Sequence, residues 1–225
     1  MHRTSFFIGQ DIKTVIFDCD GVLFDSNRIK SDVFSEVLSG ESRLAVDAFS
    51  KFHAANGGLS RYRKFEWFYR DYLKDCEWEH RSKVAASDFA LKVTDRLMKA
   101  SMVNGAKELL EALAKAKIQC FVISGGAQNE VRELIAFRGL SPFFCKVYGS
   151  PKSKIEHLQN LKENGLLNEP GIFIGDALSD LEAAKKFALD FVFVEKHSLW
   201  KSGAVVVLQE GYGVVRDLSQ IQCFI

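Results

Sequence analysis

The chain has 225 residues, of which 47% are hydrophobic and 26% are charged, and its formal net charge is +1. This composition is typical of a soluble globular protein, and the balanced charge argues against nucleic acid or a membrane surface as a partner. The five cysteines have no paired short spacings, which argues against a disulfide framework or a zinc site and indicates a cytoplasmic location. The apolar run within residues 1–9 is too short for a signal peptide, and no run is long enough to cross a membrane. The sequence leaves the oligomeric state open.

The first predicted strand, residues 12–18, is apolar and runs into two acidic residues. Gly21 marks the turn that follows. Because side chains alternate along an extended chain, Asp18 and Asp20 point to the same side, whereas Cys19 faces the core. Two carboxylates this close raise each other's pKa or bind a cation. We therefore expect a metal-dependent phosphoryl-transfer site in which Asp18 is the nucleophile.

Residues 26–100 are rich in aromatic and charged residues without strand-like alternation, and we expect about four helices there. Ser26 is placed to cap a helix over residues 27–38, which Gly40 ends. The Asn56-Gly57-Gly58 segment predicts a loop. Four aromatic residues follow the helical spacing i, i+3, i+4, i+7 and are expected to pack inside this region: Phe65, Phe68, Tyr69 and Tyr72.

From residue 104 onward, apolar strands alternate with amphipathic helices, which predicts an α/β fold with a parallel sheet covered on both faces. The expected strands are 118–123, 146–148, 171–174 and 191–194. A first helix is expected around Ala106 to Leu113, and the others are 127–138, 153–164 and 178–187. The final residues, 203–225, are ambiguous, and Ala204 to Leu208 fits either an edge strand or core packing.

Polar residues follow three of the predicted strands, at the edge where parallel sheets bind ligands. Ser124-Gly125-Gly126 precedes a helix, so its backbone N–H groups and hydroxyl are suited to binding a phosphoryl group. Asp176 ends another strand, and Asp180 lies in the first turn of the next helix. Together with Asp18 and a backbone carbonyl near Asp20, these carboxylates match the oxygen ligands of Mg²⁺. Helix capping is the alternative for Asp180.

Two lysines, Lys152 and Lys154, lie at the start of the helix predicted over residues 153–164. A lysine there is able to neutralise charge on Asp18 and on a phosphoryl group. Its charge is unfavourable next to the positive end of a helix, which indicates another purpose. We favour Lys154, because it directly precedes the apolar pattern of the helix, and the alternative for either residue is a solvated surface lysine.

Taken in order, Asp18-x-Asp20-Gly21-Val22, Ser124, Lys154 and Gly175-Asp176-x-x-x-Asp180 resemble the four motifs of the haloacid dehalogenase superfamily. The resemblance covers nearly the whole chain. It implies a Rossmann-like parallel sheet core, formed by residues 1–25 and 101–225. The helical insertion, residues 26–100, looks like the all-helical cap domain of the phosphoglycolate phosphatase and β-phosphoglucomutase type.

The resemblance also implies a role for each matched residue. Asp18 resembles the nucleophile that forms an aspartyl-phosphate, and Asp20 resembles the general acid and base. Ser124 and Lys154 resemble the catalytic clamps on the phosphoryl oxygens. The residues implied to hold Mg²⁺ are Asp18, Asp20, Asp176 and Asp180. Since dehalogenases lack an acid at the position of Asp20, the expected activity is that of a phosphoric monoester hydrolase or a phosphomutase.

Substrate-binding residues are expected in the helical insertion and after the second core strand. Arg61 or Lys64, near the glycine loop, is suited to an anionic substrate because such side chains pair with carboxylate or phosphate. The alternative is ion pairing on a solvated helix face. Gly125 is expected to contribute to the substrate site. His53 is expected to be a packing or helix-surface residue and not a ligand.

The expected function is therefore a Mg²⁺-dependent phosphatase acting on a small phosphorylated metabolite through an aspartyl-phosphate. A sugar-phosphate mutase on the same scaffold is one alternative. A phospho-acceptor or binding domain without turnover is another, and a phosphonatase would need a Schiff-base lysine such as Lys64. The sequence does not identify the substrate, because phosphoglycolate, sugar phosphates and nucleotides all fit.

Overall fold

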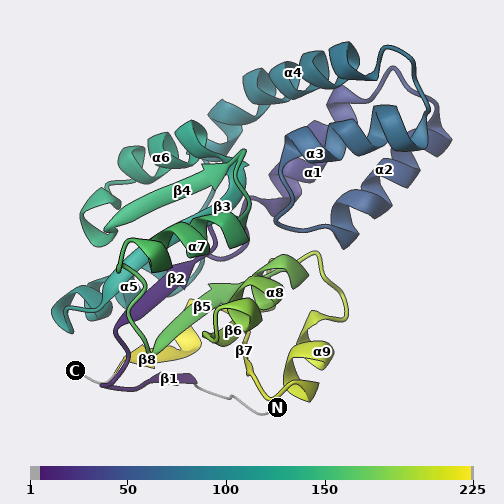
Figure 1. Ribbon diagram of the computed structural model, residues 1–225. Helices are drawn as coiled ribbons and strands as arrows, with labels where there is room; N and C mark the ends of the chain where they lie inside the picture. The colour runs from purple at the N-terminus through teal and green to yellow at the C-terminus, as the bar shows by residue number, and fades with distance from the viewer. Residues whose placement is uncertain (1–5, 224–225) are drawn as a thin grey trace.

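The computed structural model describes residues 6–223, and it contains a six-stranded sheet in which all the paired strands are parallel (Figure 1). The first five and last two residues of the predicted core lie outside the described residues. The strands, in their order across the sheet, are β4 (Lys146–Ser150), β3 (Gln119–Ala127), β2 (Thr14–Phe17), β5 (Gly171–Gly175), β6 (Asp190–Val194) and β7 (Gly213–Val215). The first strand of the sequence motif is thus central, with β3 and β5 on either side of it.

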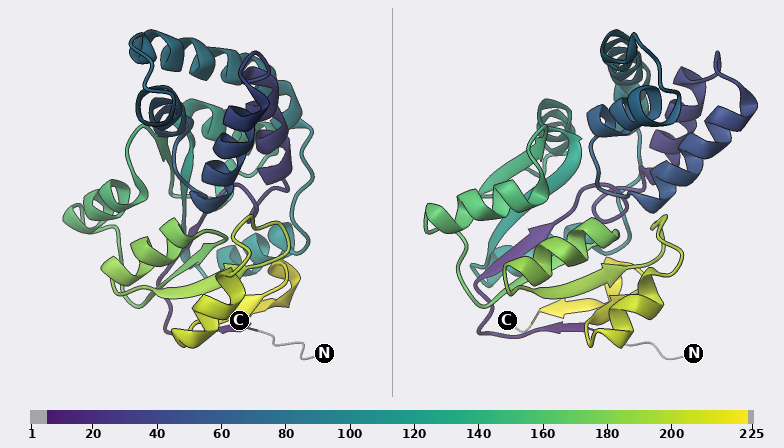
Figure 2. Two further views of the ribbon diagram at one scale, coloured as in Figure 1. Left: turned by 90° about the vertical axis from the view of Figure 1, so that its right-hand side faces the viewer. Right: turned by 45° about the vertical axis from the view of Figure 1, so that its right-hand side comes forward.

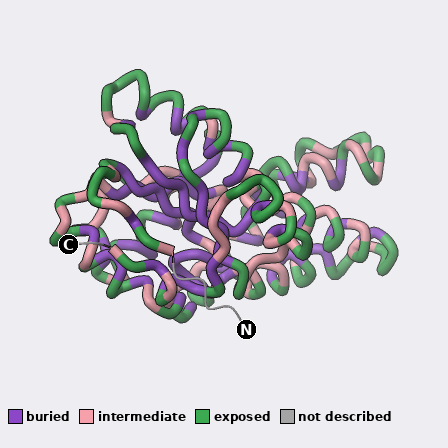
Figure 3. The backbone as a smooth tube through the Cα atoms, turned by 90° about the horizontal axis from the view of Figure 1, so that it is seen from below, coloured by how far each residue is buried: buried purple, intermediate pink, exposed green. Residues whose placement is uncertain are grey.

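Helices cover both faces of this sheet, so its central strands β2 and β5 are buried along their whole length. One face packs against α5 (Ala106–Lys115) and α6 (Gln128–Phe137). The other packs against α7 (Lys154–Glu163), α8 (Leu178–Lys186) and α9 (Gly203–Gln209). The buried strands run through the middle of the tube in Figure 3, and the turns between elements are largely exposed. Two short 3₁₀ turns, Ser141–Phe143 and Leu218–Gln220, complete the core. The predicted α/β fold is confirmed.

The remaining helices form a group beyond the carboxyl end of the sheet, which we call the helical cap (Figure 2). It consists of α1 (Asn27–Val37), α2 (Arg43–Ala55), α3 (Arg61–Glu66), its π-helical continuation η1 (Trp67–Tyr72) and α4 (Trp78–Met98). The ring of Phe34 lies 5.1 Å from that of Phe49, 5.4 Å from that of Phe65 and 4.3 Å from that of Phe89. Aromatic contacts of this kind add to the apolar area they bury, and these rings belong to the same buried cluster as one face of the sheet. In the part of the chain that the structure describes, no helix is long and apolar enough to cross a membrane.

The chain leaves the sheet for the cap and returns from it along two adjacent segments. The amide of Asp25 donates to the carbonyl of Ser101 at 2.9 Å, and the amide of Val103 donates to the carbonyl of Leu23 at 2.9 Å. This crossing lies close to the predicted boundaries at residues 26 and 100. The division of the chain into two domains at these residues stays a prediction.

In the C-terminal segment the core-packing alternative is confirmed, because Val207 is buried in the core. Val205 and its neighbours form the helix α9 instead of an edge strand, because β6 pairs with the later segment Gly213–Val215 and the valine run packs against the sheet with only part of its surface. Tertiary packing here outweighs β propensity. The sequence also gave no sign of the small parallel pair of β1 (Phe6–Ile8) and β8 (Ile221–Cys223).

The strand predicted to stop before Ser124 continues to Ala127. Its pairing with β4 becomes irregular after Ile123 and resumes where Ala127 lies opposite Ser150. The Ser-Gly-Gly segment is therefore an irregular end of β3 and not a separate turn. α6 begins immediately afterwards at Gln128.

Candidate active site

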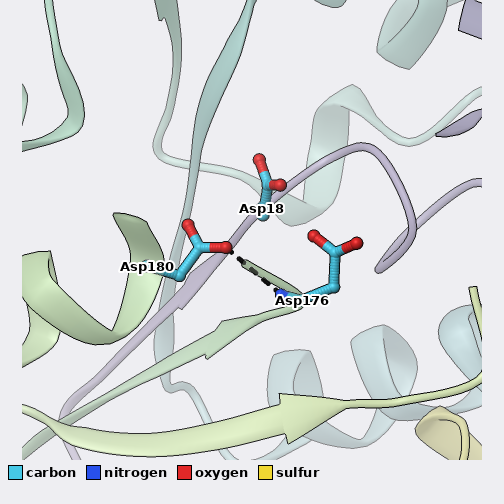
Figure 4. A group of neighbouring side chains, drawn as sticks. All are labelled: Asp18, Asp176 and Asp180. Atoms are coloured by element: carbon cyan, nitrogen blue, oxygen red, sulfur yellow. Dashed lines mark hydrogen bonds between the residues drawn. The ribbon is translucent and has the colours of Figure 1, made fainter. Parts of the chain in front are cut away.

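Three buried carboxylates meet where β2 and β5 end. Asp18 follows β2, Asp176 follows β5, and Asp180 lies in the first turn of α8 (Figure 4). One oxygen of each carboxylate lies within 4.8 Å of the other two. Because these parallel strands are neighbours, their carboxyl ends bring together residues that are far apart in the sequence.

Lys154, the first residue of α7, joins two of these carboxylates. Its Nζ lies 2.9 Å from Oδ1 of Asp18 and also pairs with Oδ1 of Asp180. The second oxygen of Asp180 accepts hydrogen bonds from the backbone amides of Asp176 at 3.2 Å and of Ala177 at 3.1 Å. Asp180 therefore caps α8 and holds the lysine at the same time. Lys152 is exposed in the preceding loop.

The group carries more negative than positive charge. Burial raises the pKa of Asp18 to about 7, against the attraction of Lys154, and the nearby Asp180 adds to the rise. Burial and the Asp18 charge also raise the pKa of Asp176 well above its usual value. Although burial opposes it, the two carboxylates raise the pKa of Lys154, which stays an ammonium. One ammonium among three carboxylates leaves a deficit of positive charge.

The donor set fits a divalent cation. Oδ1 of Asp18 is buried and accepts no well-directed hydrogen bond, although Lys154 lies close to it. Oδ2 of Asp176 is oriented by the side-chain amide of Asn27, which donates to it at 2.7 Å. Carboxylate oxygens are hard ligands of the kind that Mg²⁺ takes, usually together with several waters.

Asp20 lies apart from the three-carboxylate group, and its side chain is held by α1. The hydroxyl of Ser26 donates to Oδ1 of Asp20 at 2.5 Å, and the ammonium of Lys30 pairs with its other oxygen. Burial acts to raise the pKa of Asp20, but Lys30 and Ser26 together lower it. The expectation that the Ser26 side chain caps α1 is wrong. The Ser26 hydroxyl makes no capping hydrogen bond and donates to Asp20 instead.

Ser124 and Gly125 lie at the irregular end of β3. Ser124 is buried, and its hydroxyl accepts a hydrogen bond from the amide of Gly126 at 3.0 Å. A Cβ at Gly125 would lie 2.0 Å from the carbonyl oxygen of Gly58 in the cap loop. Position 125 must therefore be glycine for the loop to approach this closely.

The cap is joined to the core by two further polar contacts. The hydroxyl of Ser179 donates to the carbonyl of Gly57 at 2.9 Å. Arg61 of α3 donates through both terminal nitrogens to Glu130 of α6, at 2.7 and 2.6 Å. The substrate-binding role expected for Arg61 stays a prediction, and the observed contact is an ion pair between cap and core. These contacts hold the cap against the core beside two pockets, one of about 60 Å³ next to Asp18 and one of about 460 Å³ lined by Ser124, Gly125 and Lys154.

We expect Glu130→Gln to lower the free energy of unfolding by about 1–3 kcal/mol, because it leaves the buried Arg61 guanidinium without its charge partner. Urea unfolding followed by circular dichroism measures this. Glu133→Gln, on an exposed position of the same helix, is the matched control and should leave the midpoint within error. Equal midpoints for the two variants would show that the ion pair contributes nothing.

The sequence reasoning missed several residues that contact the site. Asn27 and Lys30 extend from the first turn of α1 to Asp176 and Asp20. Their spacing of three residues, directly after the acidic strand end, is the signal that points to them. The loop after β6 also contributes, because the Ser198 hydroxyl donates to the Asp176 carbonyl at 2.5 Å.

The fold and this carboxylate centre define an α/β enzyme with an inserted helical cap. Residues 12–188 match the family model described as haloacid dehalogenase-like hydrolase. The chain therefore belongs to the haloacid dehalogenase-like hydrolase family, which confirms the resemblance seen in its motifs. No curated protein sequence matches the chain.

Solved structures share the fold at low sequence identity. A predicted phosphoglycolate phosphatase from Haemophilus somnus has a TM-score of 0.70 at 17% identity, covering 94% of this chain and 96% of its own. A candidate β-phosphoglucomutase from Bacteroides vulgatus has a TM-score of 0.73 at 18% identity, and the match covers 94% of this chain and 86% of the other. A candidate hydrolase of the same family from Bacillus subtilis, bound to magnesium, has a TM-score of 0.61 at 15% identity, covering 81% and 88%.

Proposed function

We propose that the protein is a Mg²⁺-dependent phosphatase that hydrolyses a small phosphate monoester through an aspartyl-phosphate on Asp18. The observation that carries this proposal is the contact of the Asp18 carboxylate with Lys154 inside a group of three buried carboxylates. An anionic nucleophile attacks an anionic phosphate only where the surrounding positive charge offsets their repulsion. The structural relative described as a predicted phosphoglycolate phosphatase agrees with this function, whereas the one described as a β-phosphoglucomutase agrees with the mutase alternative.

The residues around Asp18 are proposed to bind the metal ion and the phosphoryl group. Asp18, Asp176 and Asp180 would hold Mg²⁺ directly or through water. The ion, when bound, neutralises charge on the phosphoryl group and on the nucleophile. Lys154, which lies against Asp18, would add a second positive charge, and we assign the buried Ser124 hydroxyl and the Gly125 amide to binding phosphoryl oxygens.

Asp20 is the proposed proton carrier. Because Lys30 and Ser26 lower the pKa of Asp20 in the free protein, Asp20 must take up a proton when the anionic substrate binds. In the first step, the P–O bond to the leaving group breaks as an Asp18 oxygen bonds to phosphorus, and Asp20 gives that proton to the departing oxygen. In the second step, Asp20 takes a proton from a water that attacks the phosphorus, which releases phosphate and restores Asp18. Ser26 and Lys30 keep the Asp20 side chain in one orientation for both steps.

The mutase alternative requires space for a second phosphoryl group on a sugar. Two pockets adjoin at this site, one of about 60 Å³ beside Asp18 and one of about 460 Å³ lined by Ser124, Gly125 and Lys154, so kinetics and not pocket size separates the two enzymes. A trace of bisphosphorylated activator would strongly raise the turnover of a mutase and leave that of a phosphatase unchanged.

We expect Asp20→Asn to lower turnover of alkyl phosphates by about 10²-fold, because their leaving oxygen needs a proton. Turnover of p-nitrophenyl phosphate should fall less, since nitrophenolate leaves without one. Phosphate release from both esters, measured with wild-type and variant protein, tests the proposal. Equal losses on the two esters would contradict the role of Asp20, and no phosphate release by the wild type would contradict the function itself.

A further inference from the structure

Three cationic side chains line the cavity beside the proposed nucleophile, and two of them are already paired with acids. Lys30 pairs with Asp20, and Arg61 pairs with Glu130. Lys64 of α3 is 3% exposed, yet among residues 6–223 no carboxylate lies within ion-pair distance of it. Of the three cations that line this cavity, Lys64 is therefore the one without a carboxylate partner among the described residues.

A directed chain of hydrogen bonds holds Lys64 in place. Its Nζ lies 2.7 Å from Nδ1 of His53, and Nε2 of His53 lies 3.0 Å from the hydroxyl of Ser31. Ser31 gives its own proton to the carbonyl of Asn27 at 2.9 Å. The Ser31 oxygen must then accept from Nε2–H, so that Nδ1 of His53 is the acceptor for the Lys64 ammonium. Two N–H donors of Lys64 remain for a ligand.

This arrangement is unfavourable for the protein alone. Burial, assisted by the charge of Lys30, lowers the pKa of Lys64 to about 7, and the Asp20 and Asp176 carboxylates offset only part of that effect. Burial and the Lys64 charge lower the pKa of His53 to about 2, so the imidazole is neutral. A buried cation without a counter-charge costs stability, and such a residue in a catalytic cavity is typical of a ligand contact.

We propose that Lys64, positioned by His53 and Ser31, binds a carboxylate of the substrate, so that the substrate is the phosphate ester of a short hydroxy acid. The inference rests on the proposed phosphatase function and gives its substrate class. Lys64 and Asp18 line the same cavity of about 60 Å³, which has room for roughly four to six water-sized groups and so suits a short acid between them. His53, expected to be a packing or helix-surface residue, is here a positioning residue.

The test compares 2-phosphoglycolate with its neutral amide, phosphoglycolamide, on the full chain with Mg²⁺. We expect wild-type kcat/KM to favour the acid by about tenfold or more, since a charge-assisted pair is lost with the amide. Lys64→Met should bring the ratio of the two values close to one and raise Tm, because it removes an uncompensated buried charge. Lys51→Met, at an exposed position of α2, is the matched control and should keep the wild-type ratio.

Two variants of His53 separate positioning from packing. His53→Leu fills the space between the rings of Phe34 and Phe49 but removes the acceptor for Lys64, so KM for the acid should rise more than kcat changes. His53→Asn keeps an acceptor near the position of Nδ1 and should restore much of the preference for the acid. Equal losses of that preference in both variants would show that His53 only packs.

The outcomes distinguish this inference from the function on which it rests. Phosphate release from p-nitrophenyl phosphate, with equal kcat/KM for the acid and the amide, would support the phosphatase and overturn the role of Lys64. A preference for the acid that survives Lys64→Met, or a lowered Tm for that variant, would also overturn it. No release from any ester would overturn the proposed function and this inference together.

Discussion

Asp18→Asn is expected to slow phosphate release from p-nitrophenyl phosphate by roughly 10⁴-fold or more, because an amide does not attack phosphorus as a carboxylate does. The variant keeps the size of the side chain in a position where little space is available. Steady-state phosphate release with saturating Mg²⁺ measures the loss. In the wild type, a phosphorylated protein trapped by rapid acid quench should carry its label on Asp18, and the variant should carry none.

The stability of the same variant is the control for its fold. Because burial holds the pKa of Asp18 above its unfolded value, this group destabilises the folded state once the pH exceeds the unfolded value, and the effect is complete above about pH 7. Asp18→Asn removes that cost, so at pH 8 without Mg²⁺ its Tm should equal or exceed that of the wild type. Retained activity in a folded Asp18→Asn protein would exclude Asp18 as the nucleophile.

Removal of Mg²⁺ is expected to lower turnover by about 10³-fold, because a bound cation contributes several kcal/mol of charge stabilisation at a phosphoryl group. The loss should appear on treatment with EDTA and be reversed by added Mg²⁺. Asp176→Asn should raise the Mg²⁺ concentration needed for half-maximal activity. Glu182→Gln, at an exposed position on α8, is the matched control and should not change it.

Undiminished turnover in EDTA, in protein shown by elemental analysis to be metal-free, would contradict the metal assignment. An increase of Tm with Mg²⁺ in the wild type, smaller in Asp176→Asn, would report binding independently of turnover, because a ligand stabilises the state that binds it.

The sequence contains enough information to place the carboxylate centre because its residues follow apolar strands directly. Asp18 and Asp176 are each the first polar residue after a buried run, and parallel strands bring such positions to one edge. The apolar helical pattern that directly follows Lys154 favours it over Lys152, and its Nζ lies 2.9 Å from Oδ1 of Asp18. Local periodicity also predicted the α/β fold and the helical character of the insertion.

What the sequence did not predict depends on contacts between distant segments. Arg61 and Glu130 are separated by 69 residues, and no local sequence pattern predicts that the Glu130 carboxylate pairs with the Arg61 guanidinium. The pairing of Lys30 with Asp20 is closer in sequence, but it depends on the direction in which α1 leaves the strand. The valine run of α9 has a strand-like composition, yet it forms a helix, and the later segment β7 pairs with β6 instead. The cytoplasmic location and the absence of a nucleic-acid partner stay predictions from composition.

The adjacent entry and exit of the helical cap bear on how the sheet forms. Among residues 6–223, β2 pairs with two strands, β3 and β5, and both come much later in the chain. Closing a long flexible loop costs entropy and slows the pairing of distant strands. A cap that folds early brings Leu23 next to Val103, so the long loop between β2 and β3 becomes a short one. The insertion that covers the catalytic carboxylates would thereby also speed the assembly of the strand that carries Asp18.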